Sequence, residues 1–404
     1  MNKDSILLFT KDALPTDYLP CYGNTYWKGK TPNMDEMVKK GTLFTNFYTA
    51  APSSAMAYMA MFTGKYSYEQ NIKKYVPLVN SYSGETLFDK ARAKGFECHI
   101  IWDEIWMSTS YKHSLCYGEG TIFHPLHGLR QGVGFHYKHE GFLHPDKEKE
   151  EQTLKMITDE ISKIVCSNQK VFVWFHLPHV INGRVGYGTD IDVHDKVLGI
   201  MRTFFDDSNI FISADHGNMN GHKGILGYGF HVYEHAIKIP LITPRKAGMV
   251  CCNDLISNID LDKIIFDGDK VPKREVIISD SAYYAQPNRK TVFLYENYRY
   301  IYNKASKTEE LYDIVWDPNQ SFNLIEDKCY DEDRKVVNIS RELYFYPYWD
   351  KLPAIREKLR AEKDKIWKEE SFSQKAINGL SAQMKKNELM RAIGKKTMRL
   401  LFKH

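Results

Sequence analysis

Short apolar segments alternate with helix-forming segments up to residue 242, and this alternation limits the folds that the chain can adopt. The apolar segments have the length and the content of β-branched and aromatic residues that buried strands require. Strands are expected at 5–10, 42–50, 96–102, 171–179, 209–215 and 237–242, and helices at 32–41, 84–95, 147–166 and 191–205. Because strands separated by helices are typical of parallel pairing, the sequence predicts an α/β fold. Its large, mostly parallel sheet would be flanked by helices.

The pattern changes near residue 273, where short aromatic strands follow one another without helices between them. Such strands favour a small antiparallel subdomain at 273–330. Residues 331–404 are charged and mainly helical in pattern, so we expect a helical, basic extension there. The main α/β domain would occupy 1–272. It is interrupted at 103–146 by an irregular insertion rich in His, Tyr, Phe and Gly, which either shapes a substrate pocket or lies on the surface.

A Pro-Ser-Ser turn at residues 52–54 leads into a segment rich in Met and Ala that ends at Thr63-Gly64. This pattern predicts a helix whose N-terminus presents a serine hydroxyl. The N–H groups of a first helical turn and the positive end of the helix dipole attract anions. Ser53 or Ser54 is therefore either a group that faces an anion or only the N-cap of the helix, and the turn alone leaves both open.

Acidic and imidazole side chains follow two of the predicted strands. Asp12 comes just after the first strand, and Asp215 with His216 comes at the end of the strand at 209–215. The carboxyl ends of parallel strands lie at one edge of a sheet, where ligands bind in such folds, so we expect these groups to meet the serine turn. Asp12, Ser54, Asp215 and His216 would then hold one divalent metal ion, whether Ca²⁺, Mg²⁺, Mn²⁺ or Zn²⁺.

The composition excludes several classes of partner and location. A net charge of +4 over 404 residues gives no signal for binding nucleic acid. The sequence has no run of about 18 apolar residues and no signal-peptide pattern at its N-terminus. Its seven cysteines are odd in number and form no Cys-x-x-Cys pair. We therefore expect a cytoplasmic protein without structural disulfides, and the sequence gives no indication of its oligomeric state.

The C-terminal segment has a pattern of its own. Between Lys375 and Lys403 there are eight basic residues and one acidic residue, Glu388, and apolar residues recur at near-helical spacing. Basic amphipathic helices of this kind bind anionic membrane surfaces. Residues 375–404 are therefore expected either to hold the protein as a peripheral protein at the inner face of a membrane or to dock on the domain or on a partner chain.

Five segments resemble, in the correct order, blocks of the sulfatase family within the alkaline phosphatase superfamily. They are DALPTDYLPCYGN at 12–24, TPNMDEMV to YEQNI at 31–72, FHLPH at 175–179, ISADHGNMNGHKG to YEHAIKIPLI at 212–242, and RYIYN to FNLIED at 299–327. In the family, the nucleophile precedes a Thr-Gly pair by nine residues. The pair that begins at Thr63 therefore selects Ser54 and not Ser53. The resemblance implies an alkaline phosphatase-like fold with ester chemistry at Ser54.

The chain departs from typical sulfatases at two places. Sulfatases carry Cys-x-Pro-Ser-Arg, or Ser in place of the Cys, and convert the first residue to formylglycine. Here residues 54–58 read Ser-Ala-Met-Ala-Tyr, so the Pro and the Arg are both absent and Tyr58 stands in the place of the Arg. Ala13 replaces the second Asp of the first metal motif. Both departures resemble the relatives that transfer phosphoryl groups with an unmodified Ser or Thr.

The resemblance also suggests roles for residues around the nucleophile. Lys223 would neutralise charge on the transferred group, and His179 and His231 would protonate the leaving oxygen or contact the ester. Relatives with two metal ions carry a His four residues after an acidic ligand on the middle strand. Here Gly183 stands at that distance from His179, so one metal ion is expected. Residues expected to contact the substrate are Lys11, His176 and His222. His222 is also a candidate ligand of a second metal ion. Each histidine named in this paragraph could equally be an ordinary packed or solvated residue.

Three classes of function follow. The first is a metal-dependent hydrolase or transferase that acts on a small-molecule, glycan-linked or lipid-linked phosphoester through a covalent Ser54 intermediate, in cell-surface glycan or lipid-headgroup metabolism. The second is a sulfuric ester hydrolase with Ser54 modified or unmodified. The third is a non-catalytic protein with the sulfatase fold, which would have no need of Asp12, Ser54 and Asp215 together. The missing Arg favours the first class.

Overall fold

The computed structural model describes residues 4–23, 29–69, 82, 84–103, 117–129, 136–139, 142–145, 147–166, 169–178, 187–281, 288–325, 328–330, 336–337 and 345–367. The chain forms two compact units, Met1–Pro347 and Tyr348–His404. The larger unit contains the α/β fold and the candidate site. In the smaller unit, the described residues form a 3-10 helix, η6 (Trp349–Lys351), and a helix at 352–367.

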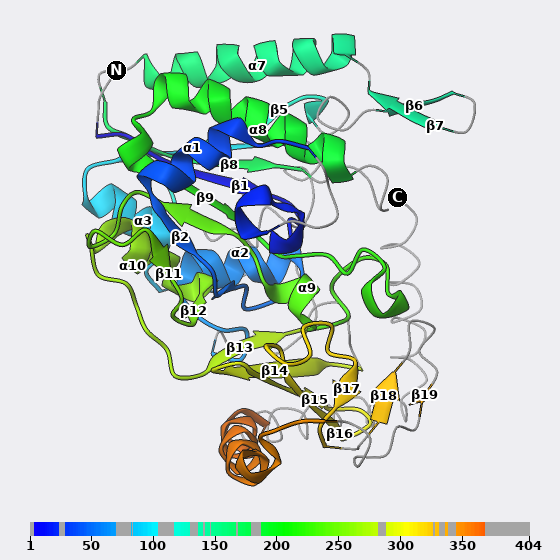
Figure 1. Ribbon diagram of the computed structural model, residues 1–404. Coiled ribbons are helices and arrows are strands. Elements are labelled where there is room, and N and C mark those ends of the chain that lie inside the picture. Colours follow the sequence, from blue (N-terminus) through cyan, green and yellow to red (C-terminus); the bar gives the residue numbers. More distant parts are fainter. Residues whose placement is uncertain are drawn as a thin grey trace, which may run out of the picture. The chain divides into compact units, whose positions relative to one another are not determined.

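An eight-stranded sheet forms the centre of the larger unit, in the order β11-β2-β10-β9-β1-β8-β4-β5 (Figure 1). Its strands are β1 (Ile6–Lys11), β2 (Thr42–Phe44), β4 (Glu97–Asp103), β5 (Ile122–Leu126), β8 (Val171–Leu177), β9 (Ile210–Ala214), β10 (Leu241–Thr243) and β11 (Cys251–Cys252). The strands from β9 to β5 are parallel, so the predicted α/β class is confirmed. In contrast, β10 runs antiparallel to both of its neighbours, β9 and β2.

Helices cover both faces of this sheet (Figure 1). One face carries α1 (Pro32–Lys40), α7 (Lys147–Val165) and α8 (Tyr187–Phe204), and the other carries α2 (Ser54–Thr63), α3 (Leu87–Ala93) and α10 (Leu261–Phe266). Because both faces are covered, all seven residues of β8 are buried, and five of the six in β1. This double burial explains why these strands are continuously apolar instead of alternating with polar residues.

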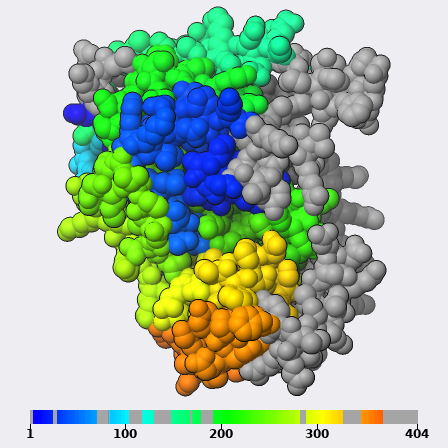
Figure 2. Space-filling view, viewed as in Figure 1, coloured from blue at the N-terminus to red at the C-terminus, as the bar shows by residue number. Residues whose placement is uncertain are grey.

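The N-terminus of α1 is held by a side chain of α8. The carboxylate of Asp195 accepts hydrogen bonds from the backbone N–H groups of Asn33 at 3.2 Å and Met34 at 2.9 Å. These bonds satisfy donors that have no partner within the helix itself. Figure 2 shows the two helices packed side by side, α1 in blue and α8 in green. The contact therefore fixes the start of α1 against α8 on one face of the sheet.

The helix α2 is buried along its whole length, which agrees with its lack of a polar face. It begins at Ser54 and ends at Gly64, whose φ of 67° lies in the left-handed region that favours glycine. A Cβ atom on Gly64 would lie 3.2 Å from the carbonyl oxygen of Ile259. The helix packs on α3 and α10, so the first residue of α2 is held on a rigid element.

The predicted antiparallel subdomain is present as a four-stranded sheet with β13 (Ile277–Asp280), β14 (Lys290–Tyr295), β15 (Tyr298–Asn303) and β16 (Thr308–Asp313) in that order. Two smaller sheets are also present. One pairs β3 (Phe47–Tyr48) with β12 (Ile256–Ser257), and the other has the three strands β17 (Phe322–Asn323), β18 (Lys328–Tyr330) and β19 (Val336–Val337). Ile277, Val292 and Ile301 of the four-stranded sheet pack with Met219 and Ile237. The subdomain therefore supports the segment that follows β9.

The insertion at 103–146 contributes one strand to the main sheet, because β5 pairs in parallel with β4. Within it, β6 (His136–His139) and β7 (Phe142–Pro145) form an antiparallel hairpin. The other residues of the insertion are described only in part, and the basic segment 375–404 lies outside the described residues. In the part of the chain that the structure describes, no helix is long and apolar enough to cross a membrane.

Candidate active site

Asp12 and Asp215 lie side by side because β1 and β9 are paired in parallel, with Lys11 opposite Ala214. Directly after Asp12 the chain turns at Ala13, whose φ of 56° is unusual for a residue other than glycine. This turn directs the backbone N–H of Ala13 to Oδ1 of Asp215, 3.0 Å away. The same oxygen accepts the backbone N–H of His216 at 2.8 Å. Two backbone donors thus orient one carboxylate.

His216 connects these carboxylates to the serine. Its Nδ1 atom lies 2.8 Å from the carbonyl oxygen of Gly217, so Nδ1 carries the proton and donates it to that oxygen. In this tautomer Nε2 has a lone pair, and it lies 3.0 Å from Oγ of Ser54. A metal-ligating histidine is commonly held by such a bond from its other nitrogen to a backbone carbonyl.

The four groups converge on one small, buried volume. Nε2 of His216 lies 3.6 Å from Oδ1 of Asp12 and 3.5 Å from Oδ2 of Asp215. One ligand atom from each of these three residues lies within 4.8 Å of the others. Among the described residues, Oδ2 of Asp215 has no hydrogen-bond partner although it is fully buried. A buried carboxylate oxygen without a partner is costly unless a cation binds it, so this set of oxygen and nitrogen donors fits a divalent metal ion.

His176, expected to contact substrate, is buried in a network of aromatic side chains. Its Nδ1 lies 2.8 Å from the hydroxyl of Thr10, and its Nε2 lies 2.9 Å from the hydroxyl of Tyr58. Burial lowers the pKa of His176 to about 3, against an opposing effect of Asp12, so the ring is neutral. Tyr58, which stands where a sulfatase has Arg, is therefore oriented by His176 and adds no positive charge to the site.

The lysines and the remaining histidines lie in different surroundings. Lys11 is fully buried as the last residue of β1, next to Asp12 in the chain. The Nζ atom of Lys223 donates a hydrogen bond to the carbonyl oxygen of Gln320 and lies over the ring of Tyr233. His231 forms a 3.0 Å hydrogen bond with Lys290, and His179 lies outside the described residues. Lys223 and His231 are thus both joined to the antiparallel subdomain.

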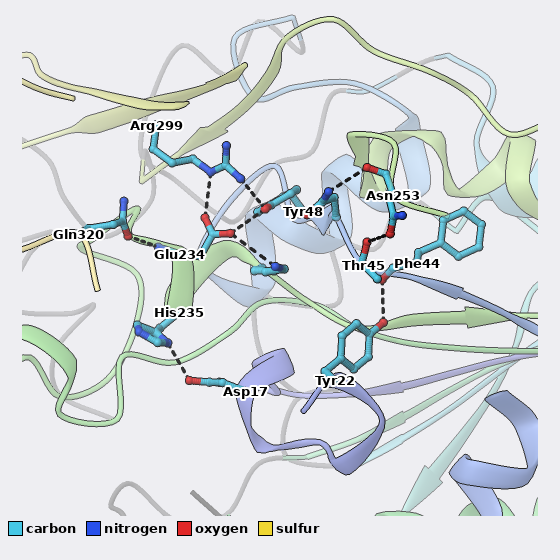
Figure 3. Close-up of polar contacts among 12 residues, drawn as sticks. Asp17, Tyr22, Phe44, Thr45, Tyr48, Glu234, His235, Asn253, Arg299 and Gln320 are labelled. Carbon is cyan, nitrogen blue, oxygen red and sulfur yellow. Dashed lines mark hydrogen bonds and ion pairs between the residues drawn. The ribbon is translucent and has the colours of Figure 1, made fainter. Parts of the chain in front are cut away.

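His222 belongs to a second group of metal-binding side chains, which we call the Asp17 cluster and which consists of Asp17, His222 and His235. Oδ2 of Asp17 lies 2.7 Å from Nδ1 of His235 and 3.4 Å from Nε2 of His222. Figure 3 shows Asp17, on the 3-10 helix η1 (Thr16–Tyr18), pointing toward His235 on α9 (Glu234–Ile237). Burial alone would raise the pKa of Asp17, but hydrogen bonds from the two histidines lower it to about 2.

The sequence patterns indicated only His222 from this cluster and did not identify Asp17 or His235 as candidate ligands. Both lie within segments that resemble family blocks, but no regular spacing connects them with His222. The backbone brings His235 close to the segment that carries His222, since the N–H of Gly217 donates to the carbonyl oxygen of Ala236 at 2.9 Å. A Cβ atom on Gly217 would lie only 2.1 Å from the carbonyl oxygen of His235, so this close approach requires glycine.

Comparison with known proteins gives a family for the N-terminal part of the chain. Residues 4–180 match the family model described as Sulfatase. Human arylsulfatase D is 36% identical over 70 residues, which is 17% of this chain and 12% of that protein. The chain therefore matches only a small part of the length of this curated relative.

Solved structures share the fold over most of the chain. A protein in complex with its substrate D-glucosamine-2-N,6-O-disulfate matches with a TM-score of 0.66 and 14% identity, over 91% of this chain and 99% of that one. A 2-O GAG sulfatase matches with a TM-score of 0.65 and 15% identity, over 92% and 94%. The phosphonate monoester hydrolase of Agrobacterium radiobacter matches with a TM-score of 0.66 and 14% identity, over 90% and 96%. At such identities the likeness shows the fold alone.

The fold is therefore an α/β fold shared with solved sulfatases and a phosphonate monoester hydrolase, and Asp12, Asp215 and His216 form a candidate metal site beside Ser54. The match to the family model then makes the assignment narrower for one part of the chain: residues 4–180 are similar to the sulfatase family.

Proposed function

We propose that this protein is a metal-dependent hydrolase or transferase that acts on a phosphoester through a covalent intermediate on Ser54. The observation that carries the proposal is the position of Ser54. Its hydroxyl is at the first residue of α2, 3.0 Å from Nε2 of His216, and His216 in turn lies within 3.6 Å of Asp12 and Asp215. A serine that only capped the helix would not need this buried set of carboxylates and imidazole.

The metal ion would be held by Asp12, Ser54, Asp215 and His216, as the buried and unpartnered Oδ2 of Asp215 indicates. When bound, such an ion lowers the pKa of an alcohol and withdraws charge from phosphoryl oxygens. The backbone donors on Asp215 and the carbonyl partner of His216 hold both side chains in place before any substrate arrives. This preorganisation is what phosphoryl transfer requires most from a protein.

The reaction would proceed in two steps. Oγ of Ser54 gives up its proton to solvent and forms a bond to phosphorus while the P–O bond to the leaving group breaks, and the leaving oxygen takes up a proton. In the second step the oxygen of water, for a hydrolase, or of an alcohol, for a transferase, forms a bond to phosphorus while the Oγ–P bond breaks. The proton that this water or alcohol gives up restores the hydroxyl of Ser54. The N–H groups of the first turn of α2 face the negative charge in both steps. His179 and His231 remain the proposed proton donors to the leaving oxygen.

The choice of a phosphoester over a sulfate ester depends on residues 54–58. The Pro and Arg that accompany formylglycine formation are absent, and the hydroxyl of Tyr58 is bonded to the buried His176. These features support an unmodified serine as the nucleophile. The alternative, a sulfatase, has the support of the sulfated sugar named for one structural neighbour. That neighbour also supports a glycan-linked substrate, beside the lipid-linked class expected from the sequence.

Two measurements test the proposal. Mass spectrometry of the peptide that contains Ser54 should find unmodified serine, whereas the loss of two hydrogen atoms, as in formylglycine, would overturn the choice of a phosphoester. A panel of aryl phosphate, phosphodiester and aryl sulfate should then be assayed with Mg²⁺, Mn²⁺, Ca²⁺ and Zn²⁺. Turnover of a phosphoester supports the proposal. Turnover of the sulfate alone would establish the sulfatase, and no turnover of any of them would favour the non-catalytic protein.

A further inference from the structure

The Asp17 cluster is not used by the proposed reaction, yet it has the residues of a metal site. Asp17, His222 and His235 come from three different elements, η1, η4 (His222–Gly224) and α9. Each side chain is between 15% and 22% exposed, so the cluster is largely buried but still within reach of an ion from solvent. One ligand atom from each residue lies within 4.8 Å of the other two.

The distances in the cluster are close to those between the ligands of a tetrahedral zinc ion. Bonds of about 2.0–2.1 Å to zinc place neighbouring ligand atoms roughly 3.3–3.4 Å apart. Nε2 of His222 lies 3.4 Å from Oδ2 of Asp17, which matches this spacing. Nδ1 of His235 lies 2.7 Å from the same oxygen, so on binding an ion this separation would lengthen by roughly 0.6–0.7 Å and the stacked rings would tilt to direct their lone pairs at the ion.

The charges of the cluster also favour a cation. The two imidazole rings are stacked with their centroids 3.3 Å apart and only 11° between their planes. A neutral imidazole has a lone pair on one ring nitrogen, and a transition-metal ion can bind it there. Among the described residues, neither Oδ1 of Asp17 nor Nε2 of His235 has a hydrogen-bond partner, and both atoms are buried. The hydrogen bonds within the cluster therefore leave these two polar atoms without a partner among the described residues.

We propose that Asp17, His222 and His235 form a second metal site that binds Zn²⁺ or a similar transition-metal ion, with its fourth position open to water or a ligand. Two imidazoles and one carboxylate are a donor set of catalytic zinc sites, whereas Mg²⁺ and Ca²⁺ prefer oxygen ligands. The expectation of a single ion came from residues that follow the middle strand β8, whereas this second site lies on η1, η4 and α9.

The second site would act on the first through the backbone. Asp17 follows Asp12 in the loop after β1, and His222 follows Asp215 in the segment after β9. His235 is joined to that same segment where the N–H of Gly217 bonds to Ala236. An ion bound to the cluster would therefore tie together the two loops that carry the ligands of the first site. This inference does not depend on which ester the protein acts on.

The test uses cobalt, because Co²⁺ in a four-coordinate site with histidine ligands absorbs strongly in the visible range. The full-length Asp215→Asn protein, which lacks one carboxylate of the first site, is stripped with a chelator, supplied with Mg²⁺ and titrated with Co²⁺. We expect one equivalent of Co²⁺ to bind with the intense visible absorption of a tetrahedral complex. Adding His235→Gln or His222→Gln should weaken this binding by more than about 100-fold, since even changes to outer-shell partners have effects of 10- to 100-fold.

His124→Gln is the matched control. His124 is also 15% exposed and is also paired with a carboxylate, Glu160, at 2.7 Å. Its other nitrogen lies 3.0 Å from His99, but among the described residues these groups do not converge on one point as those of a metal site do. This variant should bind Co²⁺ as the parent does. Absence of Co²⁺ binding in the parent, or equal binding after His235→Gln, would overturn the proposal. Should Asp215→Asn fail to fold, native mass spectrometry of wild type against His235→Gln makes the same comparison, with the loss of one zinc ion expected and an equal zinc content contradicting the site.

Discussion

Nε2 of His216 lies 3.0 Å from Oγ of Ser54, although 162 residues separate them in the chain. The pairing exists because α2 begins directly beside the carboxyl ends of β1 and β9, where Asp12 and Asp215 also lie. The hydrogen bond from Nδ1 of His216 to Gly217 fixes which nitrogen faces the serine. Ser54 is therefore placed by tertiary contacts that a simple N-cap would not require.

Ser54→Ala tests the nucleophile. The variant removes only Oγ, so the buried helix α2 should fold unchanged while turnover of the best phosphoester falls by at least about 1000-fold. Ser53→Ala is the matched control, because Oγ of Ser53 is buried and has no hydrogen-bond partner among the described residues. It should keep activity within a few-fold of wild type. The reverse ranking of the two variants in a steady-state assay would assign the nucleophile to Ser53.

Asp215→Asn tests the first metal site. Asn has the same shape and its Oδ1 atom can still accept the N–H groups of Ala13 and His216, so the turn should persist. The charge is lost, and with it the tight binding of a divalent ion. We expect a melting temperature near that of the metal-free wild type, together with loss of the rise in melting temperature that added Mg²⁺ causes in the wild type. An unchanged response to added metal would mean that Asp215 is not a ligand.

Tyr58→Phe tests the network that replaces the sulfatase Arg. Removing the hydroxyl leaves Nε2 of the buried His176 without its partner, which should lower the free energy of unfolding by about 1–3 kcal/mol. Urea denaturation measures this change. Tyr117→Phe is the control, since the Tyr117 hydroxyl makes no hydrogen bond within the described residues. Equal stability of the two variants would show that the bond to His176 adds nothing.

Glu234→Gln tests the ion pair that holds α9 to the antiparallel sheet. Figure 3 shows the carboxylate of Glu234 between Arg299, at 2.9 Å, and the hydroxyl of Tyr48, at 2.6 Å. Removing one partner of such a buried pair should reduce stability at pH 7 by about 3–5 kcal/mol. Glu36→Gln, which breaks an exposed pair with Lys39, should change stability far less.

The same pair predicts a dependence on pH. Burial alone would raise the pKa of Glu234, but the charges of Arg299 and Lys238 and the hydrogen bonds it accepts hold the pKa below its ordinary value. A lowered pKa in the folded state contributes stability that is present above the unfolded pKa of about 4.3 and is lost as the pH falls through the folded value. The wild type should therefore lose more stability between pH 7 and pH 3 than Glu234→Gln. Parallel curves for the two proteins would contradict this assignment.

Local patterns predicted most of the architecture. The apolar sequence at 5–10 indicated a buried parallel strand, as β1 is, and the charged sequence of α7 indicated a helix over nearly its observed range. In contrast, β10 turned out antiparallel and β5 joined the main sheet from within the insertion. Strand direction and sheet order depend on where the connecting loops travel, and apolar periodicity does not contain that information.

The sequence by itself determined the α/β class, and it indicated Asp12, Asp215 and His216 because each follows a strand whose type can be read locally. The choice of Ser54 over Ser53 came from the resemblance to the sulfatase family. Only the tertiary structure decided which histidines belong together. It buried His176 against Tyr58 and joined His222 to Asp17 and His235. The physical reason is that contacts between loops depend on backbone pairings such as that of Gly217 with Ala236, which form only when the whole sheet is assembled.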